Sequence, residues 1–321
     1  MPRPFCYLQK RFVPLEEARL PVMTHAFLYG TAVFEGVRGN WSDERSETLI
    51  FRPIEHFQRL KQSAHIMHIG LPESPEELSD ITAQVVAQAG YHEDTYIRPI
   101  AYKSGEVIGP KLDGVADDFM CFAIPFGNYL DPYAGLRCQT STWRRVPDTS
   151  IPARAKVNGL YVNSALAKTE AVENGYDEAI MLNDDGHVSE GSGENLVMIR
   201  HGRLITPARS DNVLEGITLD SVFELARDEL GLQVIERTID RSELYVADEV
   251  FLTGTAAHIS PVGEVDRRTV GTGNVGPITK KLQDLFFDII RGRNAKYAHW
   301  LRGVKPVEEA AAVGAGARAK A

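Results

Sequence analysis

Apolar side chains repeat along this chain at two different spacings, and the wider spacing predicts helices. Leu78, Ile81, Val85 and Ala89 follow one another at intervals of three or four residues, which places them on one face of a helix. Ser74 stands before this stretch, followed by a proline and two glutamates, and this combination favours a helix start. Helical spacing likewise predicts helices at residues 55–67, 160–173, 216–230 and 277–291.

Short apolar runs bounded by turn residues predict strands. The runs are residues 27–36, 48–51, 96–103 and 119–126 in the first part of the chain, and residues 137–143, 178–182, 196–199, 234–238 and 249–253 in the second. Because the strands come in runs with helices between them, we predict an α+β fold. The second part is expected to be largely antiparallel.

A turn-rich segment, residues 127–135, separates the two parts and predicts an interdomain linker. We therefore expect a smaller N-terminal α/β domain at residues 1–126 and a larger, strand-rich domain at residues 136–304. Residues 305–321 end in an alanine- and glycine-rich run with few anchoring side chains. They are predicted to form a disordered tail.

Composition excludes several classes of function. The 321 residues are 43% hydrophobic and 25% charged, as is usual for a soluble globular enzyme. The net charge of −9 argues against nucleic-acid binding, which needs basic surfaces. No apolar run has the length of a signal peptide or a membrane span. The three cysteines and nine histidines lack the spacing of disulfide frameworks or metal sites. We expect a cytoplasmic, metal-free protein that does not bind membranes.

One lysine, one tyrosine and one glutamate form the first candidate site. Lys156 lies between small residues just before a glycine and a predicted helix, Tyr161 follows it, and Glu190 lies in a predicted turn rich in glycine and serine. A nucleophilic lysine needs a desolvated site. Pyridoxal phosphate needs such a lysine, together with an acidic partner for its ring nitrogen. Taken alone, these residues fit a surface lysine and two turn residues equally well.

Candidate phosphate-binding groups occur in three other places. Gly216, Ile217 and Thr218 begin a predicted helix, whose free N–H groups and dipole suit an anion. Thr255 follows a predicted strand and offers a hydroxyl and a backbone N–H. Arg59 offers a guanidinium, although its polar neighbours favour a solvated helix face when composition alone is considered.

A second glycine-rich segment matches a nucleotide-binding motif but lacks its context. Residues 271–276 have the G-x-G-x-x-G pattern, which binds dinucleotides when it lies between a strand and a helix of a βαβ unit. Here Pro277 opens a helix, after which the chain runs into its low-complexity end. We therefore reject a nucleotide-binding oxidoreductase and predict an ordinary loop.

Seven separated blocks, in order along the chain, resemble those of fold-type IV pyridoxal phosphate enzymes, most closely branched-chain amino acid aminotransferases. The blocks are residues 23–36, 58–60, 96–99, 153–164, 188–195, 216–218 and 254–257. The resemblance implies a two-domain fold like that of D-amino-acid aminotransferase, with pyridoxal 5'-phosphate as cofactor. It also implies transamination between L-leucine, L-isoleucine or L-valine and 2-oxoglutarate, which yields branched-chain 2-oxo acids and L-glutamate.

The resemblance also implies individual roles for residues of these blocks. Lys156 would carry the cofactor covalently, Tyr161 would bond its ring oxygen, and Glu190 would pair with its ring nitrogen. The residues implied to hold the phosphate end are Arg59, Gly216, Ile217, Thr218 and Thr255. The residues implied to bind substrate are Tyr29, Phe34, Gly36, Tyr96, Arg98, Tyr129, Thr255 and Ala256.

Within the substrate set, a tyrosine and an arginine are expected to face the same way. Tyr96 and Arg98 are two positions apart on a predicted strand, so both side chains leave one face. This spacing fits carboxylate recognition and a solvated amphipathic strand equally well, whereas the resemblance favours carboxylate binding. It also places Tyr29 in the neighbouring subunit's pocket, which implies a homodimer or a higher homo-oligomer with shared active sites.

Other activities of the same fold remain as alternatives. They are D-amino-acid or (R)-amine transamination and, after these, an aminodeoxychorismate lyase; residues 96–98 favour the L-branched-chain group. A non-catalytic relative is disfavoured because the cofactor set is complete. Three departures from the family pattern concern the substrate range: residues 104–109 lack a Met-Gly-Val run, Phe126 replaces a common tryptophan, and His258 stands where an acid often occurs.

Overall fold

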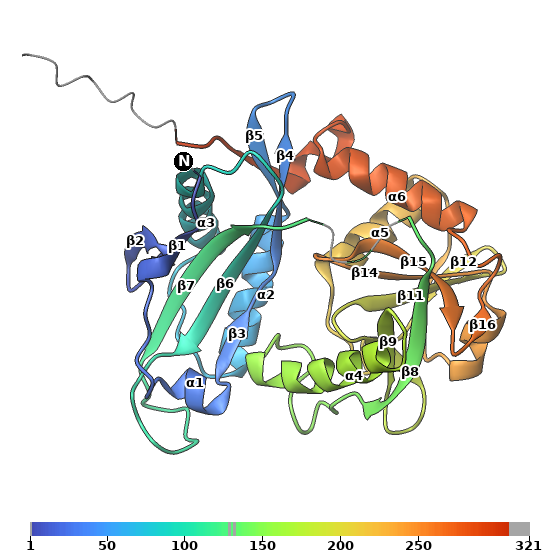
Figure 1. The fold of residues 1–321 in the computed structure, drawn as a ribbon, viewed down its shortest axis with the longest axis horizontal. Helices are drawn as coiled ribbons and strands as arrows, with labels where there is room; N and C mark the ends of the chain where they lie inside the picture. The colour runs from blue at the N-terminus through green and yellow to red at the C-terminus, as the bar shows by residue number, and fades with distance from the viewer. Residues whose placement is uncertain (1, 128–129, 131–132, 308–321) are drawn as a thin grey trace, which may run out of the picture.

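Two sheets with their helices form two lobes that lie side by side (Figure 1). The computed structural model describes residues 2–127, 130 and 133–307. Within these residues, the first sheet has eight strands: β1 (Phe5–Leu8), β2 (Arg11–Pro14), β3 (Ala32–Phe34), β4 (Val37–Ser42), β5 (Glu47–Phe51), β6 (Thr95–Lys103), β7 (Asp117–Pro125) and β17 (Leu301–Val304). Their order is β17-β5-β4-β6-β7-β1-β2, with β3 on β6, and neighbouring strands are antiparallel.

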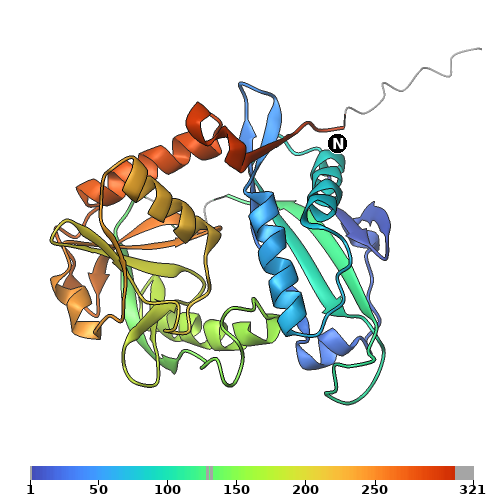
Figure 2. The ribbon, with the colours of Figure 1, turned by 180° about the vertical axis from the view of Figure 1, so that it is seen from behind.

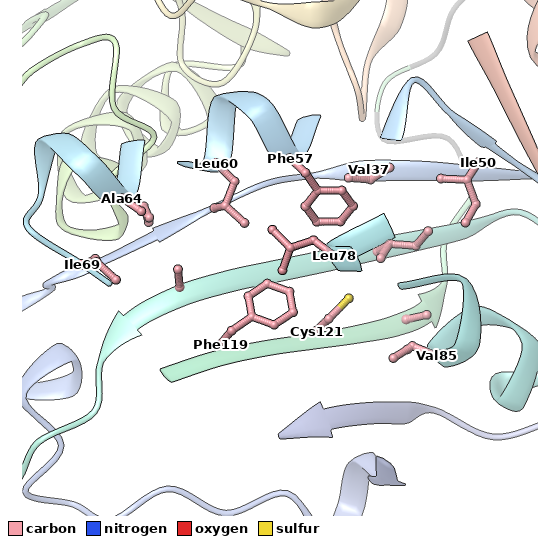
Figure 3. Close-up of a cluster of buried hydrophobic side chains, with 14 of the residues drawn as sticks. Val37, Ile50, Phe57, Leu60, Ala64, Ile69, Leu78, Val85, Phe119 and Cys121 are labelled. Carbon is pink, nitrogen blue, oxygen red and sulfur yellow. The ribbon is translucent and has the colours of Figure 1, made fainter. Parts of the chain in front are cut away.

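Helices α2 (Pro53–Ile66) and α3 (Pro75–Ala89) cover one face of the first sheet (Figure 2). Helix α3 begins as its sequence predicts: Ser74 Oγ accepts a hydrogen bond from Glu77 N at 3.1 Å, and Glu77 Oε2 accepts one from Ser74 N at 2.7 Å. The apolar faces of both helices meet the sheet in one buried cluster (Figure 3). Among its members are Val37, Ile50, Phe57, Leu60, Leu78, Val85, Phe119 and Cys121.

The second sheet has nine strands within the described residues: β8 (Leu136–Arg144), β9 (Glu178–Leu182), β10 (Val188–Gly191), β11 (Asn195–Arg200), β12 (Arg203–Thr206), β13 (Val234–Glu236), β14 (Glu249–Gly254), β15 (His258–Val265) and β16 (Arg268–Thr269). Their order is β10-β9-β8-β15-β14-β11-β12-β13, with β16 on β15. The sheet is more mixed than predicted, because β8 is parallel to both its neighbours and β12 is parallel to β13.

Three helices complete the second lobe: α4 (Tyr161–Glu173), α5 (Ile217–Asp228) and α6 (Pro277–Ile290). Alternate residues of β11 pack on opposite sides, as the pleat of a strand requires. Val197 and Ile199 meet α5 and α6, whereas Leu196 and Met198 belong to a separate apolar cluster. Helix α4 packs on β8 and β9. The predicted helices of this lobe are therefore present, each within a few residues of its predicted bounds.

The predicted strand at residues 27–36 is wrong in its first half. Residues His25–Tyr29 form a short helix, α1, and only Ala32–Phe34 are extended. Gly30 ends the helix in the left-handed conformation, with φ of 69°, and its N–H bonds Ala26 O at 2.9 Å. A glycine adopts this conformation without steric cost, so the apolar run divides at this point.

The C-terminal boundary also differs from the predicted one. The prediction puts residues 301–304 in the second domain, yet β17 pairs with β5 of the first sheet. Two contacts stabilise the return of the chain to the first sheet. The ring of Trp300 packs edge-on against Phe51, and Arg291 forms an ion pair with Asp94. Of the predicted disordered tail, residues 305–307 lie in the described part, and Val307 N donates to Ala87 O at 2.9 Å. Residues 308–321 lie outside it.

Candidate active site

A cavity of about 520 Å³ lies between the two lobes. The first lobe contributes its aromatic and cationic wall, which includes Phe34, Arg59, Tyr96, Arg98 and Phe126. The second contributes the segment around Lys156, the end of β10, the start of α5 and the turn after β14. The cavity therefore exists only because the two lobes face each other, and it contains most of the residues that the sequence predicts for the cofactor and substrate.

Lys156 is fixed to the first lobe by its backbone and points its amine into the cavity. Its N–H donates to Ser63 Oγ at 3.2 Å, and its carbonyl accepts from Phe34 N at 3.0 Å. Its Nζ lies 2.6 Å from the hydroxyl of Tyr161 and 5.0 Å from the centre of the Phe34 ring. Within the described residues no carboxylate forms an ion pair with Lys156. The amine therefore has a phenol and an aromatic ring as its near neighbours.

Glu190 lies in strand β10 and not in the turn that its glycine and serine neighbours predicted. Its side chain is 7% exposed. Oε1 pairs with Arg145 Nη2 at 2.7 Å, and Oε2 accepts hydrogen bonds from Asn195 Nδ2 at 3.1 Å and from Leu214 N at 2.9 Å. A buried carboxylate needs such compensation. These three contacts fix the Glu190 carboxylate at the cavity wall, where it remains a hydrogen-bond acceptor.

Another part of the cavity wall is rich in hydrogen-bond donors. Arg59 Nη1 donates to Glu215 O at 2.6 Å, immediately before α5. Among the described residues, no side chain caps the start of α5, so the N–H groups of its first turn, which includes Thr218, have no side-chain capping partner there. Thr255 borders the same cavity from the turn after β14. A guanidinium, a helix N-terminus and two threonines together suit a phosphate group.

The arginine that faces the cavity from β6 stacks between aromatic rings. The Arg98 guanidinium carbon lies 4.3 Å from the centre of the Phe34 ring, and Nη2 donates to Tyr96 Oη at 2.8 Å. Its Nε is buried and has no partner within the described residues. Gly36 does not border the cavity, but a Cβ there would lie 2.5 Å from Tyr96 Oη. Because glycine has no side chain, Gly36 leaves room for the ring of Tyr96.

Of the predicted substrate residues in the described part of the chain, Gly36 and Tyr29 do not border this cavity. Tyr29 is 40% exposed and does not line the cavity of its own chain; its hydroxyl accepts a hydrogen bond from Gly109 N at 2.9 Å. Tyr129 lies outside the described residues. The other predicted residues that line the cavity are Phe34, Arg59, Tyr96, Arg98, Lys156, Tyr161, Glu190, Gly216, Ile217, Thr218, Thr255 and Ala256.

The structure adds residues that the sequence reasoning missed. Arg145 and Leu214 hold Glu190, but Leu214 does so through its backbone, for which the sequence has no signal. Asn195 stands inside one of the recognised blocks and was not singled out. Glu194 borders the cavity, and no described cation forms an ion pair with it. Burial, and then the nearby charge of Glu178, raise the pKa of the Glu194 carboxyl to about 8, which favours its neutral form.

The glycine-rich segment of residues 271–276 leads into α6, and a carboxylate already occupies the start of that helix. Glu249 accepts hydrogen bonds from Ile278 N at 3.0 Å, from Thr279 N at 2.7 Å and from Thr279 Oγ1 at 2.6 Å. A phosphate would have to displace this buried acid. The segment is therefore a loop entering a capped helix, as its context predicted.

Comparisons with known proteins agree over almost the whole chain. A model of the family described as amino-transferase class IV matches residues 32–265. A probable branched-chain-amino-acid aminotransferase of Aquifex aeolicus (strain VF5) is 48% identical over 300 residues, which cover 94% of this chain and 96% of that protein.

Solved structures extend the likeness to the fold. The branched-chain aminotransferase of Thermoproteus uzoniensis, determined with norvaline, is 42% identical with a TM-score of 0.89 and covers 93% of this chain and 98% of that one. The branched-chain amino acid aminotransferase of Thermobaculum terrenum, determined in its PLP-form (holo-form), is 37% identical with a TM-score of 0.90 and covers 94% and 99%. Both lobes, and the cavity between them, belong to the shared part.

Proposed function

Because the chain belongs to the class IV aminotransferases, we propose that it transfers amino groups between L-leucine, L-isoleucine or L-valine and 2-oxoglutarate, with pyridoxal 5'-phosphate as cofactor. The observation that carries this proposal is that two groups line one cavity: the amine of Lys156, hydrogen-bonded to Tyr161, and the buried carboxylate of Glu190, paired with Arg145. The named relatives of the chain, which are branched-chain aminotransferases, support the same substrates.

The residues present fit the cofactor. The phosphate would meet Arg59, the first turn of α5 and Thr255, the ring nitrogen would meet Glu190, and the ring oxygen would meet Tyr161. Arg59 and Glu190 both border the cavity. Their hydrogen bonds to described residues do not use every N–H group of Arg59 or every lone pair of Glu190, so each can bind a further partner. The cavity is therefore polar at the two places where a phosphorylated pyridine needs polar partners.

When bound, pyridoxal phosphate supplies a carbonyl carbon for covalent capture of amines and a ring that takes up the electron pair left when a substrate loses its α-proton. Lys156 Nζ would first hold the cofactor and, once displaced by a substrate amine, would accept the α-proton and return it at the neighbouring carbon. The Tyr161 hydroxyl orients Nζ, at 2.6 Å. Glu190, held by Arg145, would pair with the ring nitrogen.

The substrate side of the cavity has both an apolar wall and a cation. Phe34, Phe122, Ile124 and Phe126 line it, and an aliphatic side chain gains free energy by contact with such a surface. Arg98 has an Nε without a partner in the described part of the chain at the same wall, which suits the second carboxylate of glutamate or 2-oxoglutarate. One pocket can therefore accept a branched aliphatic chain in one half-reaction and a dicarboxylate in the other.

The working unit is proposed to be a homodimer or a larger homo-oligomer with shared sites. Helix α1 and the neighbouring segments present exposed apolar side chains, namely Leu20, Val22, Met23, Phe27, Leu28, Val107 and Ile108. Exposed apolar side chains of this kind favour an interface, and an obligate one buries more than roughly 2,000 Å². Tyr29 lies in the same helix as Phe27 and Leu28 and does not line its own chain's cavity in the described residues, which fits a role in the partner's site.

The location of the protein is a separate matter from its chemistry. None of the helices in the described part of the chain has the length and apolarity needed to cross a bilayer. The cytoplasmic location stays a prediction, which fractionation of the source cells checks.

One spectroscopic experiment tests the proposed function. The purified protein loaded with pyridoxal phosphate should show a visible absorption band that bleaches on addition of L-leucine and returns on addition of 2-oxoglutarate. A band that responds to D-leucine and not to L-leucine would favour the D-amino-acid alternative. A protein that binds no pyridoxal phosphate would contradict the proposal altogether.

A further inference from the structure

A buried acid outside the cavity engages the arginine assigned to the phosphate. Glu35 is 0% exposed and follows Phe34, whose ring lines the cavity. Its Oε1 accepts from Arg59 Nε at 2.8 Å and its Oε2 from Arg59 Nη2 at 2.7 Å. His56 Nδ1 lies 2.8 Å from Oε2. None of these contacts involves the cavity itself, so Glu35 acts on the site only through Arg59.

The pairing decides which N–H groups of Arg59 remain free. Glu35 engages Nε and one N–H of Nη2, and the Glu215 carbonyl engages one N–H of Nη1. One N–H on each terminal nitrogen is left without a partner among the described residues. A guanidinium binds phosphate best through two such N–H groups at once. Arg59 borders the cavity, where a phosphate could meet this pair.

The charges around Glu35 keep it in the form that this pairing requires. Burial alone would raise the pKa of the Glu35 carboxyl, but the charge and hydrogen bonds of Arg59 and His56 outweigh burial and lower its pKa to about 2. Burial lowers the pKa of His56, against the opposing effect of Glu35. A neutral His56 with its proton on Nδ1 then donates to the ionised carboxylate. The lowered pKa favours the ionised form of Glu35, whose two oxygens accept from Arg59 and His56.

We propose that Glu35 is a positioning residue for the phosphate of the cofactor: it fixes the guanidinium of Arg59 so that its two free N–H groups point into the cavity. This inference rests on the proposed function. Without Glu35, Arg59 would regain rotamer freedom, and part of the binding free energy of the phosphate would be spent on ordering it. The effect should therefore fall on ligands that carry a phosphate and spare those that lack one.

The test compares pyridoxal phosphate with pyridoxal, and uses inorganic phosphate as a second probe. Glu35→Gln in the full-length apoprotein should weaken pyridoxal phosphate binding by about 10- to 100-fold and leave pyridoxal affinity within about threefold. Inorganic phosphate should raise the Tm of the wild-type apoprotein and raise that of the variant much less. Each variant is compared with itself without phosphate, so a lower starting Tm does not enter the result.

Two further variants keep the test decisive. Glu35→Asp retains the charge but is shorter by one methylene, so its preference for pyridoxal phosphate over pyridoxal should lie between those of the wild type and Glu35→Gln. If Glu35→Gln does not fold, the comparison is made between Glu35→Asp and the wild type. Glu249→Gln, which removes a buried acid at the start of α6, is the matched control and should lower Tm while keeping the wild-type ratio of the two affinities. If Glu35→Gln weakens both ligands equally, or neither, the positioning role is wrong. If the wild type binds no pyridoxal phosphate, the proposed function fails instead.

Discussion

Lys156 Nζ and Tyr161 Oη lie 2.6 Å apart, although the two residues are five positions apart in the chain. The short 3-10 helix of residues Asn158–Leu160 turns the chain between them and brings the phenol at the start of α4 back over the lysine. Both side chains border the cavity. Because the contact is local in sequence, it depends little on how the two lobes are placed.

Replacing Lys156 by alanine should abolish turnover, because no other described lysine borders the cavity. Borohydride reduction of the loaded wild type, followed by peptide mass mapping, should place the pyridoxyl group on Lys156. Lys111→Ala is the matched control, since this lysine is exposed and pairs only with Asp113 among the described residues, and it should keep full activity. A pyridoxyl group on Lys168 would contradict the assignment.

Replacing Glu190 by glutamine should slow removal of the substrate's α-proton more than it weakens cofactor binding. The amide retains the shape of the side chain but removes the charge that favours a protonated ring nitrogen. It also leaves the buried Arg145 without its ionic partner. Stopped-flow absorbance with L-leucine measures the rate, and equilibrium titration measures the affinity. Glu264→Gln, at an exposed pair with Arg137, is the control. Half-reaction rates close to wild type would mean that Glu190 has only a structural role.

Replacing Arg98 by methionine should separate the two half-reactions. The variant keeps the apolar wall and loses the cation, so the KM for 2-oxoglutarate should rise by about tenfold or more, whereas that for L-leucine should change by less than about threefold. Steady-state kinetics with each substrate varied in turn provides the comparison. Equal increases for both substrates would place Arg98 at a carboxylate that they share, and not at the second carboxylate of the acceptor.

Replacing Glu194 by glutamine should stabilise the protein at alkaline pH. The usual pKa of such a group is 4.5, and burial followed by the charge of Glu178 raises the pKa of Glu194 to about 8. Between these values the folded state holds a proton that the unfolded state releases, so stability falls as the pH rises through this window. The amide cannot ionise and removes this loss, which amounts to at most a few kcal/mol.

Urea unfolding at pH 4.5, 7 and 9 measures this effect. The difference between variant and wild type should be smallest at pH 4.5, where the carboxyl is neutral in the folded state, and largest at pH 9. A difference independent of pH would show that the substitution acts through packing and not through ionisation. The groups that set the pKa besides burial are Glu178, Lys168 and Glu190, together with the backbone N–H of Gly193.

Mixing two inactive variants tests whether sites are shared. A Lys156→Ala subunit and a Tyr29→Phe subunit should each have low activity, whereas exchange between them should regenerate one site with both residues intact. Activity should rise with exchange time to about a quarter of the wild-type value per subunit, as statistical pairing into dimers of shared sites requires. A mixture that exchanges subunits, as shown by mass measurement, but regains no activity would contradict the shared site.

The sequence by itself determined the features that depend on neighbours along the chain. Helix α3 follows from its apolar spacing and from the cap of Ser74, because both act within a few residues. The blocks around Lys156 and Glu190 predicted the cofactor through their resemblance to a known family, since their residue types alone fit a surface lysine and turn residues equally well. The exception is α1, where an apolar run with little periodicity predicts a strand although Gly30 divides it.

Only the tertiary structure decided which distant residues meet. Glu35 pairs with Arg59, and Arg145 with Glu190, through contacts across elements that neither periodicity nor composition specifies. The last strand, β17, joins the first sheet because the chain crosses back after α6 and offers its backbone donors and acceptors to the free edge of β5. Hydrogen bonds and ion pairs depend on distances of a few ångströms in space, and those distances are fixed by packing of the whole chain and not by order along it.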